Sequence, residues 1–150
     1  MGSVVLPTKG LIGVDSNIVI YSVERHPQYF PALRPLWTAV SDGLTQVLIS
    51  ELALLESLVM PYRANDQQLI ADFEKFLLLP GIEIAPVTST VMRDGAKLRA
   101  QLPRLRSPDA IHATTALGRR VTSFITNDLG FRAVQGLNVV IIDDVIGSAS

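Results

Sequence analysis

The chain has 150 residues, enough for one domain, and its 48% hydrophobic and 18% charged residues exclude intrinsic disorder. It has no cysteine, which excludes disulfides and thiolate metal sites, and only two histidines, which excludes a three-histidine metal centre. The formal net charge of −1 excludes a partner drawn in by bulk electrostatics, so nucleic acid would need a local basic patch.

The N-terminal residues show no basic segment followed by a long apolar core, so no signal peptide is expected. No apolar run reaches the roughly 20 residues that span a bilayer. We therefore expect a cytoplasmic protein without a membrane partner. Residues 1–10, with Pro7 and Gly10, are expected to form a lead-in to a single domain over residues 11–150.

Apolar runs alternate with segments of helical periodicity along the chain. Strands are predicted at residues 11–14, 47–49, 82–87, 123–126 and 139–142. Helices are predicted at residues 31–40, 50–60, 65–79, 89–102 and 107–118, with Ser50 and Ser107 as N-caps. This alternation predicts an α/β fold in three layers, a parallel five-stranded sheet between helices. The strand order does not follow from periodicity.

Residues that follow the predicted strands are candidates for a site, because open parallel sheets bind ligands beyond the carboxyl ends of their strands. Polar residues follow two strands: Asp15, Ser16 and Asn17 after the first, and Thr126, Asn127 and Asp128 after the fourth. If these strands are neighbours, Asp15 and Asp128 converge. Asp109 begins the helix that leads into the fourth strand.

Glu56 lies among apolar neighbours on its predicted helix. The residues three and four positions away are Leu52, Ala53, Val59 and Met60. We therefore expect Glu56 to face the core, where an unpaired carboxylate is costly. It then needs a partner, a proton or a metal ion.

Each acid also has a purely structural interpretation. Asp109 could complement a helix dipole, Asp128 could cap a short helix, and Asp15 could be a turn residue. Glu56 could pair with an arginine in the core. Three further polar residues are expected to have packing, surface or strand-end roles: His112, Asp143 and Asp144.

Taken together, the acids suggest a metal site. Four carboxylates in one cleft would raise one another's pKa values, and a hard divalent cation relieves this repulsion. Oxygen-only ligands favour Mg²⁺ or Mn²⁺. Such ions polarise phosphoryl oxygens and lower the pKa of bound water, so the implied reaction is hydrolysis of a phosphate ester.

Four segments carry a resemblance to a known family. They read IGVDSN at residues 12–17, IS at residues 49–50 with Glu56 further along the helix, SPDAIHA at residues 107–113 and ITNDLGF at residues 125–131. Their order and spacing resemble the PIN-domain family, and within it the VapC-type toxin ribonucleases. The resemblance runs from about Leu11 to Asp143, nearly the whole chain.

The resemblance implies a parallel sheet of order 3-2-1-4-5 and a Mg²⁺- or Mn²⁺-dependent ribonuclease, the toxin of a toxin–antitoxin pair. It implies an acidic catalytic and metal-binding site formed by Asp15, Glu56, Asp109 and Asp128. It implies supporting roles for Asn17 and Thr126, with Ser16 and Asn127 beside them. Ser16 stands where the family usually has Thr, and Gly130 where many members have a further Asp, so the metal number stays open between one and two.

The basic segment that leads to Asp109 is a candidate RNA-binding surface, because RNA binding needs positive charge near the cleft. Its basic residues are Arg93, Lys97, Arg99, Arg104 and Arg106. A solvated helix face is the alternative interpretation. No basic stretch interleaved with aromatic residues indicates the base stacking of an RNA-recognition module.

Other functions fit less well. A receiver domain needs a phosphoacceptor Asp after the third strand, where Val87-Thr88 stand, and a dehalogenase-type phosphatase needs an acid at the position of Asn17. No Gly-x-Gly-x-x-Gly follows a strand. The alternative that remains is a PIN fold that binds RNA or protein without catalysis. The resemblance also implies a homodimer and a small antitoxin protein as partners, and exposed apolar residues on the early helices would suit either. A solitary PIN domain without an antitoxin is equally compatible with the sequence.

Overall fold

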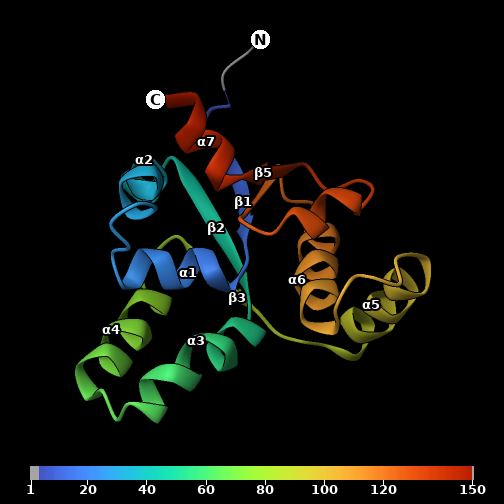
Figure 1. Ribbon diagram of the computed structural model, residues 1–150, viewed down its shortest axis with the longest axis horizontal. Helices are drawn as coiled ribbons and strands as arrows, with labels where there is room; N and C mark the ends of the chain where they lie inside the picture. Colours follow the sequence, from blue (N-terminus) through green and yellow to red (C-terminus); the bar gives the residue numbers. More distant parts are fainter. Residues whose placement is uncertain (1–3, 150) are drawn as a thin grey trace.

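The computed structural model describes residues 4–149 and contains a single five-stranded sheet. The strands are β1 (Gly10–Val14), β2 (Thr45–Ser50), β3 (Ile82–Ala85), β4 (Ser123–Thr126) and β5 (Val139–Ile141). They pair in parallel in the order β3-β2-β1-β4-β5 (Figure 1). The predicted parallel sheet and the order implied by the resemblance are both confirmed.

Helices cover both faces of the sheet. They are α1 (Ser16–Val23), α2 (Phe30–Ser41), α3 (Leu52–Arg63), α4 (Gln67–Leu77), α5 (Ser89–Gln101), α6 (Ser107–Gly118), the 3₁₀ helix η1 (Leu129–Ala133) and α7 (Ile142–Ala149). In Figure 1, α1 to α4 lie on one side of the strands and α5 and α6 on the other. No helix among residues 4–149 is long and apolar enough to cross a membrane.

Two hydrophobic cores lie on the two faces of the sheet, because successive strand residues point to opposite sides. Ile12 and Val14 pack into the larger core, beneath α1 to α4. Phe124 packs into the smaller core with η1 and the alanines of α6. At Gly13, an added Cβ would lie 2.9 Å from the Phe124 ring, so the absence of a side chain lets this ring lie against β1.

Two helix starts differ from the prediction. The N-cap of α3 is Glu51, and the hydroxyl of Ser50 accepts a hydrogen bond from the Leu52 amide at 3.2 Å. The N-cap of α6 is Arg106, which makes Ser107 the first helical residue. Each predicted N-cap is therefore one residue away from the observed one, since Glu51 follows Ser50 and Arg106 precedes Ser107.

The end of α3 also differs from the prediction. The helix continues through Pro61 to Arg63, beyond the expected end at Met60. It ends where Asn65 adopts a left-handed conformation with φ of 52°. Asparagine tolerates this region better than most residues, so it closes one helix, and Asp66 then caps α4.

Two helices were not predicted, α1 and α7, and η1 was considered only as the short helix that Asp128 could cap. Asp143 and Asp144 lie in the first turn of α7, where acids complement the helix dipole, and do not end the fifth strand. The expected lead-in at residues 1–10 and the end of the expected domain at residue 150 lie partly outside the described residues. Within the described part, residues 4–9 form no helix or strand, and β1 begins at Gly10.

Candidate active site

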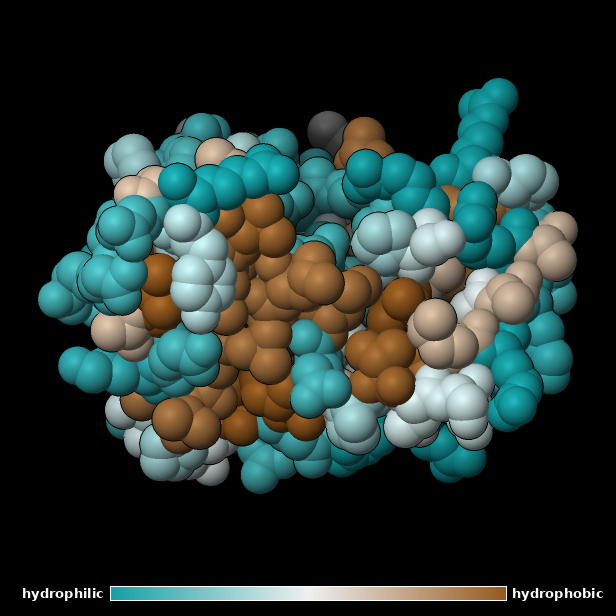
Figure 2. Space-filling model, turned by 90° about the horizontal axis from the view of Figure 1, so that it is seen from below, coloured by the Kyte–Doolittle hydropathy of each residue, from teal (hydrophilic) through white to brown (hydrophobic). Residues whose placement is uncertain are grey.

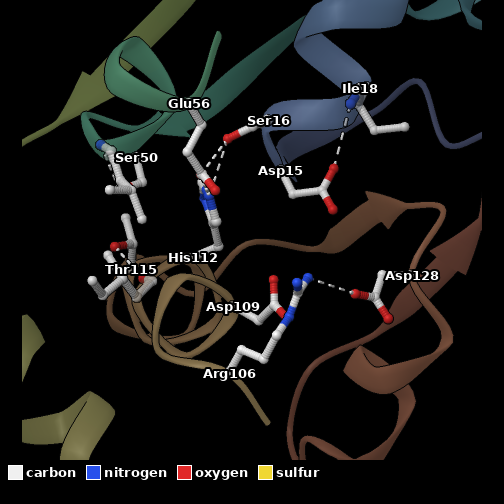
Figure 3. Close-up of polar contacts among 12 residues, drawn as sticks. Asp15, Ser16, Ile18, Ser50, Glu56, Arg106, Asp109, His112, Thr115 and Asp128 are labelled. Atoms are coloured by element: carbon white, nitrogen blue, oxygen red, sulfur yellow. Dashed lines mark hydrogen bonds and ion pairs between the residues drawn. The ribbon is translucent and has the colours of Figure 1, made fainter. Parts of the chain in front are cut away.

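The predicted acids gather at the carboxyl edge of the sheet, beside the switch point between β1 and β4. Asp15 directly follows β1, and Asp128 lies two residues beyond the end of β4. Asp109 lies in the first turn of α6, and Glu56 lies on α3. Figure 3 shows the four side chains around one region, contributed by four different segments of the chain.

Asp15 is the most buried of these acids, with 6% of its surface exposed. Its carboxylate accepts a hydrogen bond from Thr126 Oγ1 at 2.5 Å and one from the Ile18 amide at 3.4 Å, which caps α1. Burial is the largest influence on this carboxyl and raises its pKa from 3.8 to about 6, against the hydrogen bond from Thr126. The charged form of Asp15 is therefore costly in the protein alone.

Glu56 has partners that the sequence did not reveal. Its Oε1 lies 2.6 Å from Ser16 Oγ and 2.6 Å from His112 Nε2, and both groups donate to it (Figure 3). Burial raises the pKa of Glu56, but the hydrogen bonds from His112 and Ser16 outweigh it, so the pKa is lowered overall.

Two expectations about Glu56 are therefore corrected. Its partner is a histidine and not an arginine, and this carboxyl does not share in the mutual raising of pKa values expected for four acids. The expectation that Glu56 faces the core, drawn from its apolar neighbours, is also corrected. Met60 is 64% exposed, and Glu56 is only partly buried.

His112 belongs to the site, whereas the sequence analysis expected it to be a packing or surface residue. Its side chain is buried, and Nε2 lies between Glu56 and Ser16. Nδ1 has no hydrogen-bond partner among the described residues. The signal available in the sequence was spacing, because His112 follows Asp109 by three residues and lies on the same side of α6.

Asp109 and Asp128 share an arginine. Arg106 Nε donates to Asp109 Oδ2 at 3.3 Å, and Arg106 Nη2 lies 3.8 Å from Asp128 Oδ2 (Figure 3). Burial raises the pKa of Asp109, the Arg106 charge opposes this rise, and the Asp128 charge adds to it. Asp128 also accepts a hydrogen bond from the Gly130 amide at 2.8 Å, so the expectation of a cap on a short helix is correct as well.

The predicted supporting residues have separate positions. Thr126 Oγ1 donates to Asp15 and accepts from the Asp128 amide at 3.0 Å, which links the two acids. Asn127 turns away from them, donating to the Tyr29 hydroxyl at 3.1 Å and accepting from the Asp143 amide at 3.3 Å. Asn17 is exposed at the start of α1.

Tyr29 and Asp143 are neighbours of the site that the sequence analysis did not assign to it. Burial is the largest cause that raises the pKa of the Tyr29 hydroxyl, and its contact with Asp143 raises it further. Tyr29 lies at the N-cap of α2, far from Asp143 in the chain. No local pattern in the sequence joins the two residues.

The predicted basic residues divide into three groups. Arg104 and Arg106 line a hollow together with Asp109 and Asp128. Arg99 donates to the Leu105 carbonyl at 2.8 Å and to Ser107 Oγ at 2.9 Å, so it holds the loop before α6. Arg93 is exposed on α5, and Lys97 lines a separate hollow of about 690 Å³ that contains none of the four acids.

The acids suit a hard divalent cation by their chemistry. Within residues 4–149, no three histidine or acidic side chains are gathered closely enough to hold a metal ion as they stand. All the candidate donors are nevertheless carboxylate oxygens, which Mg²⁺ and Mn²⁺ prefer. Burial disfavours the charge on Asp15, and Asp109 and Asp128 already share the positive charge of Arg106. The donor set therefore fits such an ion.

Solved structures with similar folds span most of the chain. VapBC2 from Rickettsia felis, bound to a promoter DNA fragment, aligns with a TM-score of 0.70 at 18% identity, covering 87% of this chain and 98% of that one. VapC20 from Mycobacterium tuberculosis, a sarcin–ricin-loop-cleaving toxin, aligns with a TM-score of 0.65 at 16% identity, covering 81% and 93%. FitAcB from Neisseria gonorrhoeae aligns with a TM-score of 0.64 at 21% identity, covering 87% and 97%. These likenesses show the fold.

A comparison of sequences against curated proteins finds no match. The family model described as PIN domain matches residues 12–137. This range includes the four acids, all of β2, β3 and β4, and β1 from its third residue, and it ends just before β5. Because this match covers most of the chain, the protein belongs to the PIN-domain family.

Proposed function

We propose that this chain is a metal-dependent endoribonuclease that hydrolyses RNA phosphodiesters. The observation that carries the proposal is the placement of Asp15, Asp109 and Asp128 at the carboxyl edge of β1 and β4 in a PIN-domain chain. A site of this kind needs positive charge, because Asp15 is buried and its pKa is raised to about 6. Mg²⁺ and Mn²⁺ are the proposed ions.

Asp15, Asp109 and Asp128 would hold the ion. When bound, a divalent cation polarises a phosphoryl oxygen and lowers the pKa of water. Thr126 fixes the Asp15 carboxylate through its 2.5 Å hydrogen bond. Glu56, held by Ser16 and His112, keeps its charge at neutral pH because its pKa is lowered, so it can serve as a further ligand or accept a proton.

The RNA backbone would enter past Arg104 and Arg106. Both arginines are exposed and border the hollow that contains Asp109 and Asp128. A phosphate there can take Arg106 away from the carboxylates, because an exposed ion pair of this kind is weak. The arginines would therefore attract the substrate without a basic surface elsewhere.

We also assign the chain to a toxin–antitoxin pair. Beside VapBC2 from Rickettsia felis, a toxin–antitoxin complex from Klebsiella pneumoniae is similar in fold, with a TM-score of 0.60 at 24% identity, covering 87% of this chain and 97% of that one. Figure 2 shows a broad hydrophobic area on the face over α3 and α4, and Leu55, Met60 and Tyr62 of α3 are each at least 60% exposed. An apolar face of this kind indicates a protein partner. An antitoxin and a second copy of the chain are the proposed occupants.

Cleavage of total RNA by the purified chain tests the enzymatic proposal. Mn²⁺, Mg²⁺ and EDTA would be compared, beside the Asp15→Asn variant. We expect cleavage that needs the metal and that is lost in the variant. If no RNA is cut and Mn²⁺ does not raise the melting temperature, the alternative of a binding module that does not catalyse replaces this proposal.

The partner proposal has its own test. Light scattering coupled to gel filtration would measure the mass of the wild-type chain and of Leu55→Glu on α3. We expect a dimer that the charged variant dissociates. A monomer in both cases leaves an antitoxin as the occupant of the face.

A further inference from the structure

A preformed hollow lies directly beside the acids. It has a volume of about 570 Å³, within the range of about 300–1,000 Å³ typical of small-molecule sites. Its lining comes from residues 102–106 before α6, from Asp109 and Asp128, and from the part of η1 that includes Leu129. The acids and arginines of the proposed active site therefore form one part of a hollow whose remaining wall is mainly apolar.

One wall is the loop between α5 and α6. Arg99 fixes this loop by donating to the Leu105 carbonyl and to Ser107 Oγ, at 2.8 and 2.9 Å. The Leu105 amide also donates to the Leu102 carbonyl at 3.0 Å, and the Leu105 side chain is buried. The loop is thus held in place from inside the protein and does not need a ligand to order it.

The opposite wall is η1. Phe131 is fully buried, with its ring 4.9 Å from that of Phe124, and Asp128 caps the start of the helix through the Gly130 amide. This anchoring leaves Leu129 at the surface, where 59% of it is exposed although it is a large apolar residue. An exposed leucine on a fixed wall is a contact surface for an apolar group.

With a cation on Asp109 and Asp128, the hollow suits an occupant that combines an apolar face with a negative charge. Leu102, Pro103 and Leu129 offer apolar contact, and Arg104 and Arg106 offer positive charge at the same hollow. A nucleotide has both features, since its base is joined to its phosphate through a single sugar. Bases stack on aromatic rings and guanidinium planes, and enzyme pockets also hold them between apolar side chains. A purely apolar protein side chain would give Arg104 and Arg106 no negatively charged group to contact.

We infer that this hollow is a base-binding subsite, which takes the base of a nucleotide next to the scissile phosphate while Arg106 contacts a phosphate. The inference rests on the proposed ribonuclease function and adds to it a source of base preference. Gly130 keeps the junction between the hollow and the acids open by its small size. A Cβ added there would lie 3.1 Å from Asp128 Oδ1.

Nucleotide binding can be measured without cleavage. The probes are AMP, GMP, CMP and UMP with Mg²⁺, and ribose 5-phosphate serves as the matched probe that lacks a base. Amide chemical shifts in NMR spectra of the whole chain report affinity and position. We expect at least one nucleotide to shift amides of residues 102–106 and 129–133, and to bind about 10-fold or more tightly than ribose 5-phosphate.

Two variants test the wall itself. Leu129→Ala removes its apolar contact, and Ala133→Phe narrows the hollow from an exposed position. We expect both to lower nucleotide affinity about 10-fold, towards that of ribose 5-phosphate, with an unchanged melting temperature. Leu44→Ala is the control, because Leu44 is 70% exposed and does not line the hollow.

The outcomes separate the subsite from the enzyme. Equal binding of nucleotides and ribose 5-phosphate, or RNA cleavage without any nucleotide binding in the hollow, overturns the subsite and leaves the ribonuclease in place. Nucleotide binding that depends on Leu129, in a chain that cleaves no RNA, supports a nucleotide-binding hollow and overturns the ribonuclease. Tight binding that persists in both variants places the base elsewhere and overturns the subsite.

Discussion

Asp15 and Glu56 lie in the same site but in opposite electrostatic situations. Asp15 is almost fully buried, and burial raises its pKa to about 6 in spite of the hydrogen bond from Thr126. Glu56 is partly buried, and hydrogen bonds from Ser16 and His112 lower its pKa. The difference comes from burial and from the donors together. Asp15 is the more buried of the two and has one side-chain donor at 2.5 Å, whereas Glu56 has two at 2.6 Å.

The contrast indicates what each acid needs from outside the protein. The charge on Glu56 is already stabilised by groups of the chain itself. The charges on Asp15 and on Asp109, whose pKa is also raised by burial, are stabilised less well. A cation would therefore be bound most strongly on the side of the site formed by Asp15, Asp109 and Asp128.

Ribonuclease activity gives the largest expected effect. Asp15→Asn should lower kcat/KM for RNA by about 10²-fold or more, because the lost stabilisation of charge is local and electrostatic. Glu56→Gln should cost less, since Ser16 and His112 still surround the side chain. Kinetics of both variants on one RNA at saturating Mn²⁺ make this comparison. A larger loss from Glu56→Gln would reverse the assignment of the two acids.

Stability against pH tests the burial of Asp15. Its folded pKa of about 6 exceeds the ordinary 3.8, so between these values the folded state holds a proton that the unfolded chain has lost. Stability contributed by this group is therefore present below pH 3.8 and is lost as pH rises through about 6.

We expect Asp15→Asn, which carries no charge, to raise the free energy of unfolding in EDTA by up to about 3 kcal/mol at pH 8 and by almost nothing at pH 4. Urea denaturation at the two pH values measures this. Glu74→Gln, at an exposed site on α4, is the matched control. A gain for Asp15→Asn that is equal at both pH values would show that charge burial is not its cause.

Removal of Glu56 should act in the opposite direction. Glu56→Leu leaves the buried Nε2 of His112 and the hydroxyl of Ser16 without their acceptor, which costs about 1–3 kcal/mol. The melting temperature in metal-free buffer should fall. Glu51→Leu, at the exposed N-cap of the same helix, should change it little. A more stable Glu56→Leu protein would mean that Glu56 is a buried charge without adequate partners.

Arg106 gives the smallest expected change in stability. Its side chain is 74% exposed, so Arg106→Gln should alter the free energy of unfolding by less than about 1 kcal/mol. Mn²⁺ should bind more tightly to this variant, because Arg106 no longer competes for Asp109 and Asp128. Titration calorimetry beside Arg104→Gln measures the difference. Weaker Mn²⁺ binding in Arg106→Gln would contradict the competition.

The architecture could be predicted from the sequence because it depends on repeated local signals. Five apolar runs alternating with helical periodicity indicated a covered parallel sheet, and the acids after the first and fourth strands indicated its functional edge. The segment at Asp15 shows the limit of this reasoning. The acid was found, but the helix that it caps was not, because α1 is short and has no distinct periodicity in the sequence.

The family and the four candidate acids were thus accessible from the sequence, through residue type, position after a strand and the spacing of four short motifs. The tertiary structure alone decided the partner of each acid. Ser16, Glu56 and His112 are separated by 40 and 56 residues along the chain, and only the packing of α1, α3 and α6 brings them within hydrogen-bond distance. The pKa of a carboxyl depends on those distances and on burial, so the opposite behaviour of Asp15 and Glu56 is a property of the fold and not of the local sequence.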